Sequence, residues 1–323
     1  MISLRYHIVS LVAVFLALAL GIVVGSTVLQ EGTVSVLRAT SERVRQESER
    51  NSKENVALKQ EQARLQAFGA TVLPELVQDR LKGRSVVLVD TDKVDSGLRD
   101  GVRKVLEDAG ARVDGQLTFA DERLALGADA DRTAMAQLLA VDAGAPEVLR
   151  GELVKKLAAR LATSTALPQE DGQRASDMLT GLQDADFLAD DLKLSQPLAT
   201  GTDPFPRPGS MFVLLGPAAT ATTAVAPDAF LVPLADQVSA QAASGPVAGA
   251  EAFAVPKETS WILALRDNRT VSRRVSGIDS VDTVYGQLAL VEALEDSLQQ
   301  LPAGQYGTKD GASGLLPERT EGS

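Results

Sequence analysis

The chain has 323 residues, no cysteine, one histidine and a formal net charge of −11. The absence of cysteine excludes disulfides and thiolate chemistry, and the acidic balance argues against binding to nucleic acid or to an anionic lipid surface. Aromatic residues make up only 4% of the sequence, so the predicted core is aliphatic, as in sheets covered by helices.

The segment from residue 8 to residue 29 contains no charged residue. At roughly 1.5 Å per residue it spans roughly 33 Å, enough to cross a hydrocarbon core of about 30 Å. Arg5, in the preceding tail of residues 1–7, predicts that this tail is cytoplasmic and that the bulk of the chain lies outside the cytoplasmic membrane. The alternative is a cleaved signal peptide, because Ala17-Leu18-Ala19 resembles a cleavage site. We favour a retained single-pass anchor, since the run is longer than a signal h-region.

Residues 31–70 are expected to form a helical stalk, because positions 33–68 contain no Gly or Pro. Apolar residues and one Asn recur there at intervals of seven, the spacing of one seam of a coiled coil. A second seam is mostly polar, so a single solvated helix is the alternative. We favour a marginal two-stranded coiled coil and therefore a homodimer through the stalk. The predicted oligomerisation residues are Leu37, Val44, Asn51, Leu58 and Leu65.

Residues 83–301 show the pattern of a parallel-sheet α/β domain. Residues 85–90 are a continuous apolar run ending in Asp, which is typical of a strand buried on both faces. A helix at 94–109 and a strand at 112–119 follow, and a strand–helix–strand unit implies a parallel pair. We predict a Rossmann- or flavodoxin-like three-layer domain and a flexible tail at 302–323. Further strands are expected at 211–216, 247–253 and 272–275, and helices within 131–194 and at 234–243 and 283–301.

Asp90 and Asp92 lie at the carboxyl end of the first predicted strand, where ligands bind in open parallel sheets. Two carboxylates there resemble the Mg²⁺-binding first motif of haloacid-dehalogenase-like phosphatases. Asp95 replaces the apolar residue of that motif, and no convincing motif lysine follows. We interpret these acids as capping a strand-to-helix turn. The sequence also lacks a dinucleotide-binding glycine motif and an outward histidine to activate a nucleophile. It therefore predicts no enzyme, no catalytic residue and no cofactor.

Three segments resemble one known family. They are Ile2 to His7 with Leu18 to Ser26 in the apolar run, Val275 to Asp282 continuing through Gly286, and Gly304 to Gly307. They are similar to the MctB family (mycobacterial copper transport protein B) of actinobacterial envelope proteins. Gln305 stands where many members carry His. The candidate family-motif residues are Asp279, Asp282, Gly286, Gly304, Tyr306 and Gly307.

The resemblance implies copper transport or copper homeostasis, with outer-membrane association. A pore formed by this chain alone is not expected, because a transmembrane barrel needs many strands that alternate in polarity. Met135, Met178 and Met211 are the soft ligands beyond the anchor, but the last two lie in apolar runs that are typical of a core. No metal site is assigned, and copper is expected to bind only weakly if at all.

The predicted function is therefore copper homeostasis by a membrane-anchored binding or scaffold protein, with an envelope protein as a possible partner. Some relatives look like dimeric partners of the division and cell-wall machinery. The alternative function is accordingly a dimeric envelope scaffold for cell-division or cell-wall enzymes.

Overall fold

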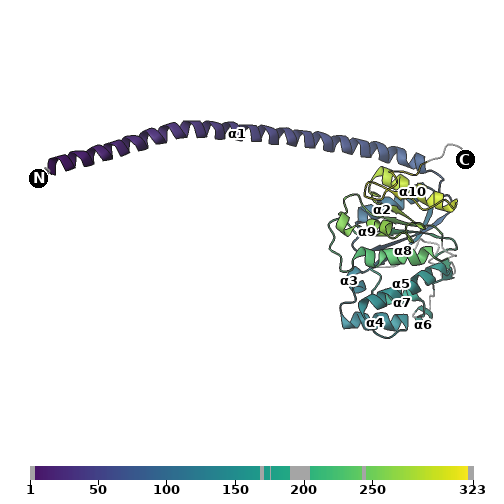
Figure 1. Cartoon of the computed structure of the whole chain (residues 1–323). Coiled ribbons are helices and arrows are strands. Elements are labelled where there is room, and N and C mark those ends of the chain that lie inside the picture. Colours follow the sequence, from purple (N-terminus) through teal and green to yellow (C-terminus); the bar gives the residue numbers. More distant parts are fainter. Residues whose placement is uncertain (1–3, 168–170, 175, 190–203, 242–244, 319–323) are drawn as a thin grey trace. The chain divides into compact units, whose positions relative to one another are not determined.

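The computed structural model describes residues 4–167, 171–174, 176–189, 204–241 and 245–318, and it divides into two compact units, residues 1–65 and 66–323. One helix, α1 (Leu4–Val77), contains most of the first unit and enters the second (Figure 1). Its segment Tyr6–Gly25 has a mean hydropathy of 2.9 and is long and apolar enough to cross a membrane. Arg45–Glu49 at 3.0 Å and Arg50–Glu54 at 2.8 Å are ion pairs along its exposed part.

The end of α1 differs from the predicted stalk, because the helix continues past Gly69 and Pro74 to Val77. Proline inside a helix removes a backbone hydrogen bond and clashes with the preceding turn. Here Leu73 and Val77 are buried in the core of the second unit. Their burial offsets the cost of the proline, and tertiary packing therefore sets the helix end.

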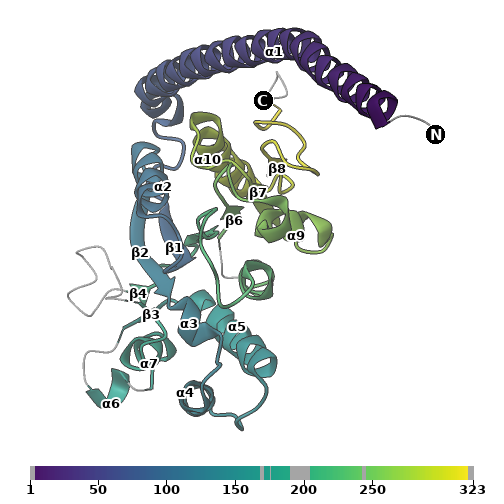
Figure 2. The same cartoon turned by 90° about the vertical axis from the view of Figure 1, so that its left-hand side faces the viewer.

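The second unit is built on a six-stranded sheet with the order β2-β1-β5-β6-β7-β8, in which every neighbouring pair is parallel (Figure 2). A separate antiparallel pair joins β3 (Thr165–Ala166) to β4 (Pro204–Phe205). The parallel α/β architecture confirms the predicted fold class at this level. The strands of the large sheet are β1 (Ser85–Thr91), β2 (Arg112–Phe119), β5 (Met211–Leu215), β6 (Val247–Ala250), β7 (Val275–Ile278) and β8 (Gln305–Tyr306).

Two hydrophobic clusters pack on the sheet, and the alternation of side chains along β1 separates them. Val87 and Val89 belong to one cluster and Val86 and Leu88 to the other. The first cluster is completed by helices α3, α4, α5, α7, α8 and α9, and the second by α2, α10 and the end of α1. The helices are α2 (Ser96–Asp108), α3 (Asp121–Leu124), α4 (Asp129–Leu139), α5 (Pro146–Ala162), α6 (Asp171–Arg174), α7 (Met178–Asp184), α8 (Leu231–Ser239), α9 (Trp261–Asp267) and α10 (Val284–Leu298).

Local signals explain the best-predicted helices. The Asp95 side chain accepts a hydrogen bond from the Leu98 N–H at 3.0 Å and caps the start of α2. Gly110 follows the end of that helix with a φ of +81°, a conformation that glycine adopts without a steric cost. Pro146 occupies the first turn of α5, where its missing N–H is not needed. These signals lie within a few residues of the element they define.

The C-terminal part of the sheet corrects two predictions. The strand expected at the edge from residue 272 to 275 is β7, which begins at Val275 and lies between β6 and β8. The edge strand is β8, within the segment that we predicted to be a flexible tail. Gly277 and Ile278 pair with Gln305 and Tyr306, so the chain after 302 is part of the folded unit. The last five residues, 319–323, lie outside the described residues.

The middle of the chain, which we predicted to be wholly helical from 131 to 194, contains the short strand β3 in addition to helices α4 to α7. Within that range, residues 168–170, 175 and 190–194 lie outside the described residues. Helix α9 was not predicted. It has only seven residues, with Trp261, Ile262 and Leu265 buried, and so it is shorter than the segments from which periodicity is read.

Candidate functional site

The motif residues at the end of β7 surround the buried carboxylate of Asp279, which is 0% exposed. The Arg266 guanidinium donates from Nη1 to Asp279 Oδ2 at 2.7 Å. The backbone N–H groups of Thr308 and Lys309 donate to the same carboxylate at 2.8 and 2.9 Å. Asp279 therefore fastens the segment that follows β8 to the end of β7.

The same contacts determine the ionisation of Asp279. Burial by itself raises the pKa of this carboxyl, but the hydrogen bonds from Thr308, Arg266 and Lys309 outweigh that effect and hold the pKa below its usual value of 3.8. Arg266 also donates from Nη2 to the Tyr306 carbonyl at 2.9 Å. One arginine from α9 thus contacts both the end of β7 and the edge strand β8.

A second buried ion pair lies at the end of β6. The Lys309 ammonium donates to Glu251 Oε1, and the Ser260 hydroxyl donates to the same oxygen. Glu251 is fully buried and Lys309 is 9% exposed. Burial raises the pKa of Glu251, while the hydrogen bonds from Lys309 and Ser260 oppose that rise. This pair gives the C-terminal segment a second attachment to the sheet.

Three motif glycines are required by close packing. A Cβ atom on Gly307, whose φ is +133°, would lie 2.0 Å from Asp279 Oδ1. A Cβ on Gly286 would lie 1.9 Å from the Ser280 carbonyl oxygen, and one on Gly304 would lie 1.9 Å from the Tyr306 hydroxyl. These distances are far inside van der Waals contact. The predicted motif glycines therefore have a packing role in a single cluster around β7 and β8.

Gln305 has an equally local role. Its side-chain amide donates to the Val275 carbonyl at 2.9 Å and to the Ser272 carbonyl at 3.1 Å. Those bonds join β8 to the start of β7. The Gln305 side chain thus supports strand pairing in this chain.

Asp282, the remaining motif residue, lies at an open cleft at the carboxyl ends of the strands. Its Oδ1 accepts a hydrogen bond from the Phe253 N–H at 2.7 Å. The cleft has a volume of about 400 Å³ and adjoins α2, α10 and the loops after β5 and β6. Its lining residues are Asp95, Gly97, Leu98, Ala218, Ala219, Ala252, Asp282 and Gln287.

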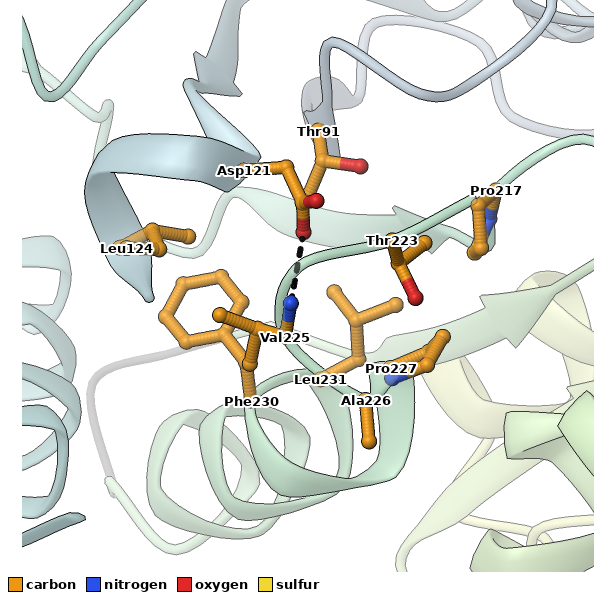
Figure 3. A pocket seen from close by; sticks show the side chains of 10 residues that line it. All are labelled: Thr91, Asp121, Leu124, Pro217, Thr223, Val225, Ala226, Pro227, Phe230 and Leu231. Carbon is orange, nitrogen blue, oxygen red and sulfur yellow. Dashed lines mark hydrogen bonds between the residues drawn. The ribbon is translucent and has the colours of Figure 1, made fainter. Parts of the chain in front are cut away.

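A smaller cavity lies nearby, between the ends of β1 and β5 and the start of α8 (Figure 3). Its volume is about 10 Å³, the size at which a cavity holds one water molecule. Asp121 points into it and accepts a hydrogen bond from the backbone N–H group of Val225 (Figure 3). It also accepts one from the backbone N–H group of Ala224. Those bonds fix the loop before α8, so this cavity belongs to the packing of the loop.

The two acids at the carboxyl end of β1, Asp90 in the strand and Asp92 just after it, both form hydrogen bonds within the fold. Asp90 is fully buried and accepts hydrogen bonds from Arg99 Nε at 2.6 Å and from Gln116 Nε2 at 3.2 Å. Burial raises the pKa of Asp90, although these hydrogen bonds oppose the rise. Asp92 accepts from the Asp121 N–H at 3.2 Å. Neither acid caps α2, because Asp90 is paired with Arg99 in the interior and Asp92 bonds to the start of α3; the cap is Asp95.

The methionines that we considered as soft metal ligands lie in the core. Met135 and Met211 are both 0% exposed and belong to different hydrophobic clusters, while Met178 packs against the cluster of Met135. Within the described residues, no group of three or more His, Cys, Asp or Glu side chains is placed to hold a metal ion.

The stalk residues remain exposed along the single chain. Leu37, Val44, Leu58 and Leu65 are between 59% and 71% exposed on α1. A row of apolar side chains on a solvated helix is the surface that a coiled-coil partner would cover.

Sequence comparisons identify the relatives of this chain. The family model described as "Copper transport outer membrane protein, MctB" matches residues 1–317. The protein named "Copper transporter MctB" from Mycobacterium tuberculosis (strain ATCC 25618 / H37Rv) is 28% identical over 97% of this chain and 98% of its own length. The protein of the same name from Mycobacterium leprae (strain TN) is 26% identical over 98% of this chain and 99% of its own. Because the family model covers nearly the whole chain, this protein belongs to the MctB family.

Proposed function

We propose that this chain acts in copper transport or copper homeostasis in the cell envelope. The observation that carries the proposal is the match of the family model from residue 1 to residue 317, together with relatives named copper transporters that align over nearly their full length. The match includes the apolar helix, the stalk and the α/β unit. The function is therefore proposed for the complete arrangement of anchor, stalk and domain.

The proposed location is a membrane of the envelope, with one span at the N-terminal end of α1. The length and hydropathy of Tyr6–Gly25 support the span, and Arg5 supports a cytoplasmic N-terminus. The α/β domain is then extracytoplasmic. An alkaline phosphatase fused after Ser323 should be active in a bacterial host, and a green fluorescent protein at the same place should be dark. The reverse pattern would contradict this topology. Membrane fractionation would separate a cytoplasmic-membrane anchor from the outer-membrane association that the family description names.

The proposed mode of action is binding or scaffolding by an anchored domain, without catalysis. The donor chemistry supports this mode, because tight Cu(I) sites use thiolate, thioether or imidazole ligands. The chain has no cysteine and one histidine, and Met135 and Met211 are enclosed in the core. Copper is then bound weakly by this chain, and its handling involves a partner protein of the envelope.

The assembled form in the proposal is a homodimer joined by a two-stranded coiled coil over 31–70. The exposed seam from Leu37 to Leu65 and the charged pairs beside it support this arrangement. Attachment to one membrane raises the effective concentration of the two stalks, which favours a marginal coiled coil. The α/β unit is proposed to be a Rossmann- or flavodoxin-like domain, supported by its parallel sheet and by the two core clusters that pack on it.

Two measurements test the proposed function. Competition against a chelator with a Kd of about 1 nM should leave the purified chain without Cu(I), and retention of a stoichiometric ion would contradict weak binding. A deletion strain should be hypersensitive to copper and should form normal septa. Normal copper tolerance with abnormal septa would contradict a copper function.

A further inference from the structure

The cleft beside Asp282 lies where the order of the sheet reverses. From β1 the chain proceeds to β2 on one side, whereas β5, β6 and β7 follow in turn on the other side. The cleft residues come from the segments that follow β1, β5, β6 and β7. In open α/β sheets, ligands bind in the crevice outside the carboxyl ends of the strands at this switch point. Position and volume together indicate a binding site.

The charge of the cleft selects the kind of ligand. Its lining contains the carboxylates of Asp95 and Asp282 and no Lys or Arg. In each residue, Oδ1 accepts a backbone hydrogen bond, from Leu98 at 3.0 Å and from Phe253 at 2.7 Å. These bonds fix the orientation of both carboxylates. Among the ion pairs of the described residues, none involves Asp95 or Asp282, so a cation in the cleft meets two carboxylates that no cationic side chain pairs with.

The other lining groups indicate the size and character of that cation. Gln287 contributes a neutral amide, and the remaining lining side chains are small or apolar. A volume of about 400 Å³ is far larger than a bare metal ion requires. An anion, which helix N-termini otherwise attract, would be repelled by the two carboxylates.

We propose that this cleft binds an organic cation, a guanidinium or primary ammonium group on a short apolar stem. Asp95 and Asp282 supply the counter-charges, and Gln287 supplies a neutral hydrogen-bonding group. The same chemical group occurs in small metabolites and in the basic side chains of polypeptides. The proposal does not depend on copper binding by the chain.

Ligand-observed NMR on the full chain in zwitterionic nanodiscs tests the proposal, with empty discs as the blank. The probes are butylguanidinium, its neutral isostere butylurea, and the peptide acetyl-Ala-Arg-Ala-amide. Butylguanidinium should bind and butylurea should not. Raising the salt from about 0.02 M to about 0.5 M should weaken binding because the charges are partly exposed. Equal binding of butylurea would overturn the proposal.

Asp95→Asn and Asp282→Asn remove one charge each and keep the Oδ1 acceptor. Asn is also as good an N-cap as Asp, so α2 should stay intact. Each change should weaken binding of butylguanidinium at least about 3-fold, the scale of an ion pair near the surface. Asp100→Asn, on the exposed face of α2 and outside the cleft, is the matched control and should leave binding unchanged.

Ala219→Trp tests the volume of the cleft, since it fills the space without altering charge. It should abolish binding while the circular dichroism spectrum stays that of the wild type.

Wild-type affinity in both Asp variants would overturn the proposal. Comparison with the peptide shows where the natural cation comes from. If the peptide binds more tightly than butylguanidinium and its binding depends on charge, the ligand is a basic side chain of a polypeptide. If butylguanidinium binds more tightly, the ligand is a free small molecule.

Discussion

Replacing Asp279 with Asn removes the charge at the centre of the β7–β8 cluster and changes the size of the side chain very little. Arg266 and Asp279 form an ion pair at 2.7 Å in which the side chains are 4% and 0% exposed. Breaking a buried pair by removing one partner costs about 3–5 kcal/mol, because the remaining charge stays in the interior. Arg266 still donates to the Tyr306 carbonyl at 2.9 Å, which places the expected loss toward about 3 kcal/mol.

Urea unfolding of the full chain in micelles measures this loss through the fluorescence of Trp261, the single tryptophan, which is 1% exposed. The matched control is Asp310→Asn. Lys257 and Asp310 also form a pair at 2.7 Å, but their side chains are 62% and 80% exposed, so its removal should have no measurable effect. If Asp279→Asn destabilises the domain no more than Asp310→Asn does, the C-terminal segment is not held by the buried pair.

Three further predictions concern other parts of the chain. Burial raises the pKa of Glu251 above its usual 4.5, so the folded state takes up a proton more readily than the unfolded state. The unfolding free energy of the wild type minus that of Glu251→Gln should therefore fall as the pH rises above about 4.5. Urea midpoints in which the wild type gains stability over the variant as the pH rises would contradict this sign. Gly286→Ala should lower the melting temperature, because its Cβ would lie 1.9 Å from a backbone oxygen. Gly151→Ala, within helix α5, is the contrasting variant. A Cβ added there meets no neighbouring atom within 4 Å, so the change should raise the unfolding free energy by about 0.5–1 kcal/mol. The double variant Val44→Asp and Leu58→Asp should sediment as a folded monomer, while an unchanged dimer mass, or a monomeric wild type, would refute the coiled coil.

The parts of the fold that could be predicted are those with long local patterns. The β1 strand is a continuous apolar run, and helix α5 combines an initial proline with leucines on one face. Strand β8 has no such pattern, since two residues carry no periodicity. It is held by Arg266 of α9, an element that was itself too short to predict. Long-range contacts therefore determine the edge of the sheet.

The candidate site, like the fold, was predicted where the sequence carries a local motif and missed where long-range contacts build it. The family resemblance identified Asp279 and the motif glycines, but not Arg266, Glu251 or Lys309, which complete the cluster. Glu251 lies inside the strand that we predicted at 247–253, and a charged residue within that apolar run was a usable signal, whereas nothing local marks Lys309. The cleft follows from topology, because only the strand order brings Asp95 and Asp282 to one place.

The copper content of cells tests the central claim most directly. Mass spectrometry would compare the wild type, a strain that lacks this chain, and the same strain carrying either the full chain or residues 66–323 alone. The proposed function predicts that the deletion strain accumulates copper, that the full chain restores the wild-type content, and that the fragment without its anchor does not. Copper content equal to the wild type in the deletion strain would contradict a role in copper homeostasis.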